Sequence, residues 1–188
     1  MSIAKQKMIE GALQLLATKG LQATSFSEVL ELTGAPRGSI YHHFPEGKDQ
    51  LILAAIELAG NRTLALLETK RGASADEITA FFLDSWRKLL DYSQFRAGCS
   101  VLAVTVAADS PQLLEKAAVI FKEWQDKLTD LYMTVGVHRE VARDFSLELI
   151  SASEGAVVLA RAQQSMQPFD SVAARLLAES NKLLPPDR

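Results

Sequence analysis

The sequence predicts an all-α protein of about nine helices, with a small N-terminal three-helix domain followed by a larger helical domain. Three observations predict this fold class. Apolar residues recur every three or four positions along nearly the whole chain, which is the period of an amphipathic helix. No segment alternates apolar and polar residues in the manner of a half-buried strand. Glycine and proline interrupt the pattern at intervals that suit helix ends.

The first three helices are expected to be separated by tight turns. Gly20 ends the first helix, as glycine commonly does. Ser25 followed by Glu28 is a capping-box pattern, which predicts a helix start. Gly34 begins the next turn, and Pro36 suits the first position of a helix because its missing N–H is not needed there. These helices are expected over residues 2–19, from about 25 to 33, and 36–44.

The remaining chain predicts six longer helices. Their expected ranges are about 47–70, 75–92, 97–108, 110–135, 138–165 and 169–184. Composition changes near residue 47, which predicts two domains, residues 1–47 and residues 48–188. The helix that starts at this boundary belongs structurally to both.

Charge and cysteine content limit the functional classes. The chain has 188 residues and a net charge of −3, and residues 1–50 hold five basic and five acidic residues. Any nucleic-acid binding must therefore come from a local patch. The single cysteine, Cys99, permits no intramolecular disulfide, which suits the reducing cytoplasm. The chain has no 18-residue run free of charge, so no membrane span is expected.

The third predicted helix has an unusual outer face. Ile40 and Phe44 are four residues apart and should face the small core. The positions left outside carry no acid, whereas a solvated helix favours Glu, Lys and Ala. They are Arg37, Gly38, Ser39, Tyr41 and His42. Such a face can approach a phosphate backbone closely, and the guanidinium of Arg37 can grip guanine O6 and N7.

Two helix starts add phosphate-binding candidates. Lys48 sits at the start of the long helix, where its charge and the free N–H groups converge on one anion position. Thr24 and Ser25 form a second such start. The adjacent pair His42–His43 does not predict a metal site, because neighbouring helical positions face different ways. No cofactor is expected.

Residues 1 to about 55 resemble the TetR/AcrR family of bacterial repressors. The residues that carry the resemblance are Gly20, Thr24-Ser25, Leu32-Thr-Gly34, Gly38-Ser-Ile-Tyr-His-His-Phe44 and Lys48-Asp-Gln-Leu51. The variant over residues 34–48 is similar to the subgroup of the lincomycin-resistance repressor and its YxaF-like relatives. Gly98-Cys99, Ala103-Val-Thr-Val106 and Trp124 extend that similarity to about residue 130. The last 55 or so residues match only in helical character.

The resemblance implies roles for the N-terminal residues. It makes Arg37, Ser39, Tyr41 and His42 contacts to DNA, with Arg37 as the best reader of bases. Thr24, Tyr41, His42 and Lys48 would mainly hold phosphates. Many family members begin the recognition helix with a Ser or Thr cap, where this chain has Ala35-Pro36, so that capping role is missing here.

The larger domain offers aromatic and small residues for a ligand pocket. Aromatic walls around small residues are typical of an apolar site, and the resemblance implies a pocket for planar aromatic or drug-like effectors. Because charged candidates are few, we expect a neutral or weakly polar ligand. The candidate residues are Phe82, Trp86, Cys99, Leu102, Val106, Phe121 and Trp124.

The segment 147–162 is apolar or small at almost every position, so its helix must be covered on most sides. One face can pack on its own domain while another meets a second subunit; burial wholly inside one subunit is the alternative. Two-fold-related recognition helices about 34–36 Å apart can also read successive major grooves, which favours a dimer. The expected interface residues are Ile150, Ser153, Val157, Val172 and Leu176.

Together these patterns predict a cytoplasmic one-component transcriptional regulator. The leading hypothesis is a homodimeric repressor that binds a palindromic operator in double-stranded DNA and is released by a small, largely apolar effector. A DNA-binding regulator without a small-molecule ligand is the alternative. A helical enzyme is disfavoured, because no nucleophile–base pair, phosphate-binding glycine loop or metal cluster is visible in the sequence.

Overall fold

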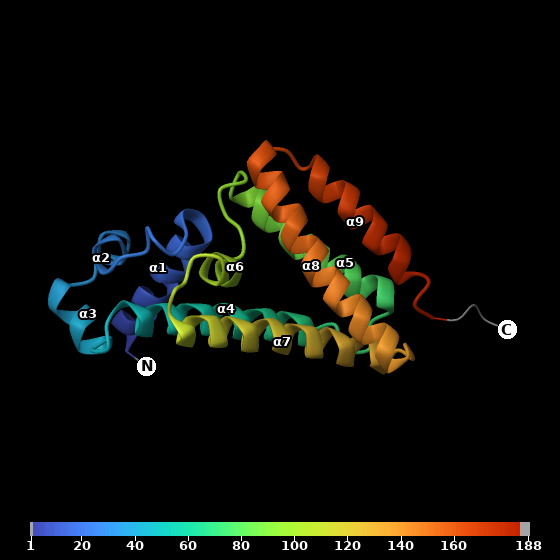
Figure 1. Cartoon of the computed structure of the whole chain (residues 1–188), viewed down its shortest axis with the longest axis horizontal. Coiled ribbons are helices and arrows are strands. Elements are labelled where there is room, and N and C mark those ends of the chain that lie inside the picture. The colour runs from blue at the N-terminus through green and yellow to red at the C-terminus, as the bar shows by residue number, and fades with distance from the viewer. Residues whose placement is uncertain (1, 185–188) are drawn as a thin grey trace. The chain divides into compact units, whose positions relative to one another are not determined.

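The structure is a computed structural model that describes residues 2–184, and all regular structure within that range is helical (Figure 1). The nine helices of this part of the chain confirm the predicted fold class. They are α1 (Ile3–Lys19), α2 (Phe26–Thr33), α3 (Arg37–His43), α4 (Lys48–Glu68), α5 (Ala75–Tyr92), α6 (Ser100–Thr105), α7 (Pro111–Thr134), α8 (Arg139–Gln163) and α9 (Gln167–Ser180).

The helices gather into two compact units. The head unit consists of Met1–Arg62 and Cys99–Phe121, and the body unit of Thr63–Gly98 and Lys122–Arg188. Helices α4 and α7 each contribute residues to both units. The head therefore contains α6 and part of α7 in addition to the three N-terminal helices.

In the head unit, α1 packs against α2, α3 and α6. Local signals in the sequence fix the helix ends. The Oγ of Ser2 accepts a hydrogen bond from the Lys5 N–H at 3.2 Å, and the Oγ of Ser25 accepts one from the Glu28 N–H at the same distance. Gly34 ends α2 with a φ of 66°, a left-handed conformation that side chains other than glycine rarely adopt.

The core of the head unit is apolar, and α4 is fastened to its neighbours by ion pairs. The largest side chains buried in it are Met8, Leu16, Ile40, Phe44, Leu51, Ile52 and Ile56. Arg62 of α4 pairs with Glu10 of α1 at 2.7 Å, and Lys116 of α7 pairs with Glu57 of α4 at 2.7 Å. These ion pairs join α4 to α1 and to α7, while α3 packs on α1 and α2.

In the body unit, α5, α8 and α9 pack against one another, as Figure 1 shows. Their core contains polar groups as well as apolar ones. The hydroxyls of Thr79 and Tyr132 lie 2.7 Å apart, and both residues are fully buried. The ring of Tyr132 also meets Phe145 edge-on, with centroids 5.5 Å apart. Burial raises the pKa of the Tyr132 hydroxyl far above its usual range.

A cluster of four charged side chains lies at the C-terminal end of α4 within the body unit. Glu68 accepts hydrogen bonds from Arg71 at 2.5 Å and from Lys127 at 2.8 Å, and Arg71 also reaches Asp130 at 2.7 Å. The hydrogen bonds from Arg71 and then Lys127 lower the pKa of Glu68 to about 2. The cluster therefore fixes the last turn of α4 against α7.

One helix, α4, is long and apolar enough to cross a membrane by length and composition alone. Core helices of soluble proteins pass the same test. Residues Leu51, Ile52, Ala55 and Ile56 of α4 are buried in the protein core, and 33% of its most apolar window is buried in all.

Candidate nucleic-acid interface

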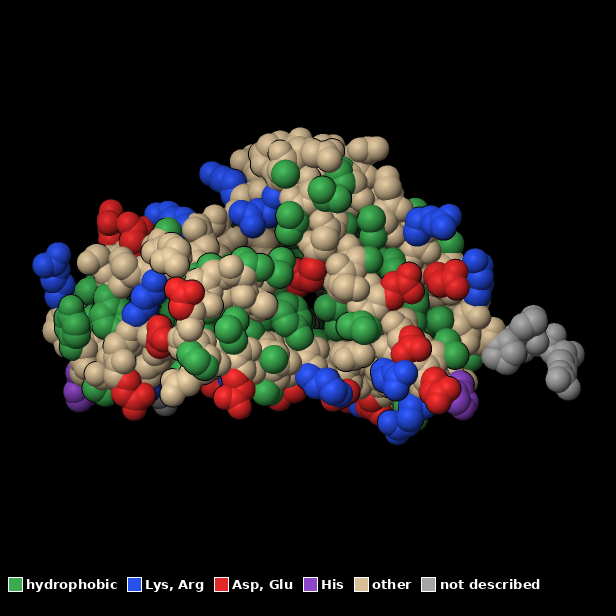
Figure 2. Space-filling view, viewed as in Figure 1, with side chains coloured by type: hydrophobic (Ala, Val, Ile, Leu, Met, Phe, Trp, Pro, Cys, Tyr) green, Lys and Arg blue, Asp and Glu red, His purple; other side chains and the backbone are tan. Residues whose placement is uncertain are grey.

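Helix α3 presents its predicted face outward. Ile40 and Phe44 are buried, as the four-residue spacing predicts, and Arg37, Gly38 and His42 are exposed. Arg37 forms no hydrogen bond or ion pair with another residue in the described range 2–184, so its guanidinium is available. Figure 2 shows basic, acidic, hydrophobic and histidine side chains at the surface of the end of the head unit that contains α3.

Tyr41 lies on the same outer face and is held by another ring. It is 65% exposed, and its ring meets that of Phe26 edge-on, with centroids 5.5 Å apart and an interplanar angle of 82°. The ring of His42 lies tilted against His43, whose Nε2 is 3.3 Å from the Oγ of Ser2. The N-terminus of α1 therefore supports the C-terminal end of α3.

Helix α3 begins one residue later than the sequence predicts. Pro36 has an extended ψ of 136° and forms the cap position, so Arg37 is the first helical residue. No side chain caps this end, in agreement with the missing Ser or Thr. The carbonyl of Pro36 instead accepts hydrogen bonds from the N–H and the hydroxyl of Ser39, at 3.0 and 2.8 Å.

Two of the predicted contact residues donate their hydroxyl protons to the backbone of the chain itself. Thr24 is 1% exposed, and its Oγ1 donates to the Gly20 carbonyl at 2.8 Å while its N–H donates to Leu21 at 3.2 Å. The hydroxyl of Ser39 donates its proton to the Pro36 carbonyl, as described above. Both residues hold turns in the structure, and neither hydroxyl proton is free for a ligand.

Lys48 and Ser25 occupy the two remaining predicted positions. The Nζ of Lys48 donates to the Leu21 carbonyl at 2.8 Å, which ties the start of α4 to the turn after α1. An ammonium group has three donors, so two remain for other acceptors. Ser25 caps α2, but only half of the predicted capping box forms, because the Glu28 carboxylate pairs with Lys19 at 2.7 Å.

The seven predicted pocket residues fall in both units. Phe82, Trp86 and Trp124 belong to the body, where Phe82 and Trp86 meet edge-on with centroids 6.5 Å apart. The head holds Cys99, Leu102, Val106 and Phe121. The sulfur of Cys99 accepts the Leu102 N–H at 3.3 Å and so caps α6. Val106, by contrast, is 75% exposed.

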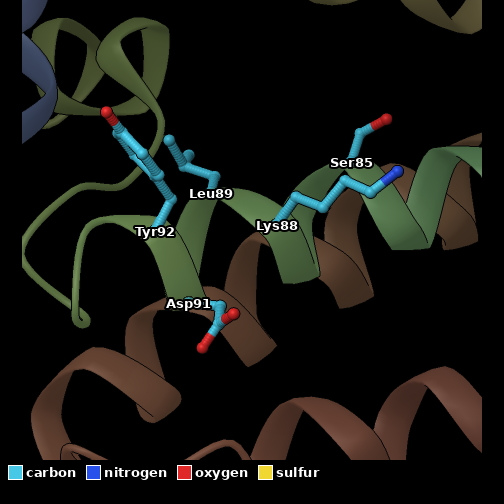
Figure 3. Close-up of a pocket in the computed structure, with 5 residues that line it drawn as sticks. All are labelled: Ser85, Lys88, Leu89, Asp91 and Tyr92. Carbon is cyan, nitrogen blue, oxygen red and sulfur yellow. The ribbon is translucent and has the colours of Figure 1, made fainter.

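The body unit also has an open hollow along α5 that the sequence pattern did not single out. It measures about 560 Å³ and is lined by Ser85, Lys88, Leu89, Asp91 and Tyr92. Figure 3 shows Ser85, Leu89 and Tyr92 rising from the same side of the helix. Tyr92 is 92% exposed, and this exposure is visible only in the structure, so no pattern in the sequence could have identified the surface.

The predicted dimer face needs a correction. Ile150, Ser153, Val157 and Leu176 are buried inside the chain itself, and Val172 is partly exposed. Four of these five side chains therefore serve the core of a single subunit. A helix that is apolar nearly all round gives no preferred direction, so the sequence pattern did not distinguish the side of α8 that is buried within the subunit from its exposed side.

The opposite side of α8 carries the exposed apolar and small residues. They are Leu147, Ser151, Gly155, Val158, Leu159 and Ala162. A Cβ added at Gly155 would meet nothing within 4 Å. Helix α9, which packs beside α8, likewise exposes Ser171, Ala174 and Ala178. Figure 2 shows hydrophobic side chains at the surface over α8.

Two family models match separate parts of the chain. Residues 8–55 match the model for bacterial regulatory proteins of the TetR family. Residues 75–175 match the C-terminal domain of LmrA/YxaF-like transcriptional regulators. The first match covers α2 and α3 completely, and the second covers more than half of the chain.

Individual proteins agree with these models. The chain is 33% identical to the HTH-type transcriptional regulator Rv0196 of Mycobacterium tuberculosis, over 92% of this chain and 91% of that one. It is 26% identical to the HTH-type transcriptional regulator YxaF of Bacillus subtilis, over 92% and 93%. The fold matches the crystal structure of a TetR transcriptional regulator from Legionella pneumophila with a TM-score of 0.84 and 23% identity, over 95% and 98%.

The outward helix-turn-helix, the two matching family models and the full-length relatives all agree. The chain belongs to the TetR family of bacterial transcriptional regulators, with a C-terminal domain of the LmrA/YxaF-like type.

Proposed function

We propose that this regulator is a dimeric repressor whose two head units bind a palindromic operator and are released by a small, largely apolar effector. One observation carries the DNA-binding part of the proposal: α3 exposes a face that contains an unpaired arginine, a glycine, a tyrosine and a histidine, and no acid. A protein with a net charge of −3 needs such a local surface to approach DNA. The cytoplasm is its proposed compartment.

The exposure of each side chain suggests its role. Arg37 reads bases in the major groove, because its guanidinium is exposed and has no partner within the described chain. Gly38 lets the backbone approach closely, since a Cβ there would meet nothing within 4 Å. Tyr41 and His42 contact phosphates together with the two remaining donors of Lys48. Thr24 and Ser39 contribute by fixing the turns, and Ser25 by capping α2.

For the dimer, we propose the exposed faces of α8 and α9 as the contact surface. Small residues such as Ser151, Gly155 and Ala174 allow two helices to approach closely. Leu147 and Val158 supply apolar area that water otherwise covers, at 56% and 49% exposure. A helix pair from each subunit would form a four-helix bundle.

For the effector, we propose binding within the C-terminal domain, with the hollow along α5 as one part of the site. Tyr92 offers exposed aromatic surface to a planar ligand in this hollow, and the partly exposed Trp86, whose ring meets the buried Phe82 edge-on, lies on the same helix. Release of DNA requires the effector to bind the DNA-incompetent state more tightly, by roughly 1–3 kcal/mol for a 5–150-fold effect. Operator DNA must then weaken effector binding by the same factor.

The DNA-binding proposal is tested with two matched arginines. Arg37 and Arg139 are both exposed and each is the first residue of a helix, α3 in the head and α8 in the body. Duplexes selected from a random library by the wild-type protein serve as operator probes. Arg37→Ala should relax the sequence preference at one position of each half-site, by about 1–3 kcal/mol, whereas Arg139→Ala should leave it unchanged. Equal effects of both changes would refute the assignment.

The dimer proposal is tested with two matched valines. Val158 on α8 and Val119 on α7 are 49% and 45% exposed. Val158→Glu should convert the protein to a monomer in light scattering at micromolar concentration, because a charge would then be buried in the contact. Val119→Glu should leave the dimer intact. A dimer that persists in Val158→Glu would show that α8 is not the contact surface.

A further inference from the structure

We infer that Phe26 is a positioning residue that holds the Tyr41 ring in place for its contact with the DNA backbone. The inference rests on the proposed function, since it assumes that Tyr41 touches a phosphate. It concerns a residue on α2 that neither the sequence pattern nor the family resemblance singled out. The observation behind it is the edge-on contact of the two rings, with centroids 5.5 Å apart and planes at 82°.

Tyr41 needs an external support because little else holds it. It is 65% exposed, and Phe26 is the partner of its ring within residues 2–184. Its hydroxyl forms no hydrogen bond with another residue of that range. The edge-on geometry is one that two aromatic rings prefer, because the positive edge of one ring meets the negative face of the other. The contact thus restrains the ring and leaves the hydroxyl available.

The backbone of Phe26 lies in a capped helix start. It is the first residue of α2, directly after the capping residue Ser25. The Ser25 Oγ accepts the Glu28 N–H at 3.2 Å, and Glu28 in turn pairs with Lys19 of α1 at 2.7 Å. The capped turn therefore fixes the backbone from which the Phe26 ring extends, and α2 packs directly on α3. The Tyr41 ring thus meets a partner whose backbone is anchored in regular structure.

The benefit of this contact is preorganisation. A free surface tyrosine would lose rotamer freedom when it binds a phosphate, and that loss weakens binding. If Phe26 restrains the ring beforehand, the loss has already occurred during folding. A leucine at position 26 keeps the apolar volume but lacks the ring face and edge that define the geometry. Phe26→Leu should therefore weaken DNA binding roughly two- to tenfold for each head.

The experiment is a double-mutant cycle on DNA affinity. The proteins are the full-length chain, Phe26→Leu, Tyr41→Phe and the double variant. The probe is a 30-bp duplex of random sequence in about 50 mM salt, because backbone contacts do not depend on sequence. Fluorescence anisotropy gives the affinity. Phe26→Leu should weaken binding in the wild-type background and have little further effect in the Tyr41→Phe background, since the hydroxyl that it positions is then absent.

Two further measurements separate positioning from general damage to the head. Tyrosine is neutral, so Phe26→Leu should leave the salt dependence of binding unchanged, whereas displacement of Arg37 or Lys48 would flatten it. Phe26→Tyr, which keeps the ring, should restore affinity to within about twofold of the wild type. Thermal unfolding of each variant confirms that the head is folded under the assay conditions.

Each outcome decides something different. If Phe26→Leu lowers DNA affinity by the same factor in the wild-type and the Tyr41→Phe backgrounds, or flattens the salt dependence of binding, Phe26 acts through packing and the inference is wrong. If Tyr41→Phe alone leaves affinity unchanged, the hydroxyl is not a contact and the inference also fails. The proposed function survives that second result as long as Arg37→Ala still alters sequence preference. Failure of the wild-type protein to bind DNA would instead refute the DNA-binding part of the proposed function itself.

Discussion

The buried hydroxyl pair of the body unit gives the most direct test of how its core is held together. Thr79 Oγ1 has one proton, which it donates to the Ala75 carbonyl at 2.8 Å. Tyr132 must therefore be the donor in the 2.7 Å contact between the two hydroxyls. Both residues are 0% exposed, so no water replaces a lost partner. Tyr132→Phe removes this donor and leaves the Thr79 oxygen with its Ala75 bond only.

The expected loss in the free energy of unfolding is about 1–2 kcal/mol, which is the usual effect of removing a buried hydrogen bond when one partner stays partly satisfied. For a chain of this length the melting temperature should fall by roughly 2–8 °C. Urea unfolding followed by circular dichroism, at one fixed protein concentration, measures the free energy. Thr79→Val is the companion change, because it replaces the acceptor with an apolar group of the same shape.

The coupling between the two changes is the decisive quantity. In the Thr79→Val background no acceptor remains for the Tyr132 hydroxyl, so Tyr132→Phe should then be nearly neutral or stabilising. If Tyr132→Phe changes the free energy of unfolding by the same amount in the wild-type and the Thr79→Val backgrounds, within about 0.5 kcal/mol, the hydrogen bond between the two hydroxyls does not contribute to stability. High pH gives an independent check on the same residue. Burial raises the pKa of Tyr132 above the usual 10.0, so its contribution is complete below pH 10 and decreases as the pH rises further. Tyr132→Phe should lack this part of the alkaline destabilisation.

Three further predictions concern charge and the DNA-facing surface. Arg71 and Lys127 lower the pKa of Glu68 to about 2. The wild type should therefore have a higher melting temperature than Glu68→Gln above pH 4.5, and the difference should disappear as the pH falls from 4.5 to 2. A difference in melting temperature that stays constant over this range would show that the cluster does not act through charge. Gly38→Ala should raise the free energy of unfolding by up to about 1 kcal/mol, and with it the melting temperature, because alanine favours a helix and its Cβ meets nothing within 4 Å in the free protein. The same variant should bind DNA more weakly in anisotropy, because the added Cβ would meet the DNA backbone in the complex. Tighter DNA binding by this variant would refute the close approach. Lys48→Ala should weaken binding to selected and random duplexes alike and lower the slope of log affinity against log salt concentration by about 1 per subunit. It should also lower the free energy of unfolding by about 1 kcal/mol, because the hydrogen bond to the Leu21 carbonyl is lost. An unchanged salt slope would limit Lys48 to its structural role.

The sequence predicts the helices of this fold closely because its stop signals are local. Gly20 and Gly34 end α1 and α2 as expected, and both have positive φ angles. The predicted range 75–92 coincides with α5, where Ser74 donates its N–H and hydroxyl to Glu77 in the first turn. The range 97–108 was too long, because α6 is confined to Ser100–Thr105. Glycine and proline do not mark the ends of α6, and the residue that caps its start is a cysteine, which is not a usual capping residue.

The candidate site was less predictable, since it depends on which partner each polar group finds. The spacing of Ile40 and Phe44 identified the outer face of α3, including Arg37 and His42. The sequence could not show that the Thr24 hydroxyl turns inward to Gly20, or that Glu28 pairs with Lys19 and leaves the capping box half-formed. Those choices are made by tertiary contacts. The ring contact between Phe26 and Tyr41 joins residues 15 positions apart and was equally invisible.

The points at which the chain passes between its two units have a consequence for protein engineering. Two of the three crossings, after Arg62 and after Phe121, lie inside the continuous helices α4 and α7. Each residue inserted into a helix rotates everything beyond it by about 100°. Chimeric regulators that combine this head with another sensory module must therefore keep helical phase at both joints. The third crossing, between Gly98 and Cys99, lies outside any helix, but residues 97–100 are buried and a Cβ at Gly98 would lie 2.7 Å from the Arg161 guanidinium, so insertions there would disturb the packing.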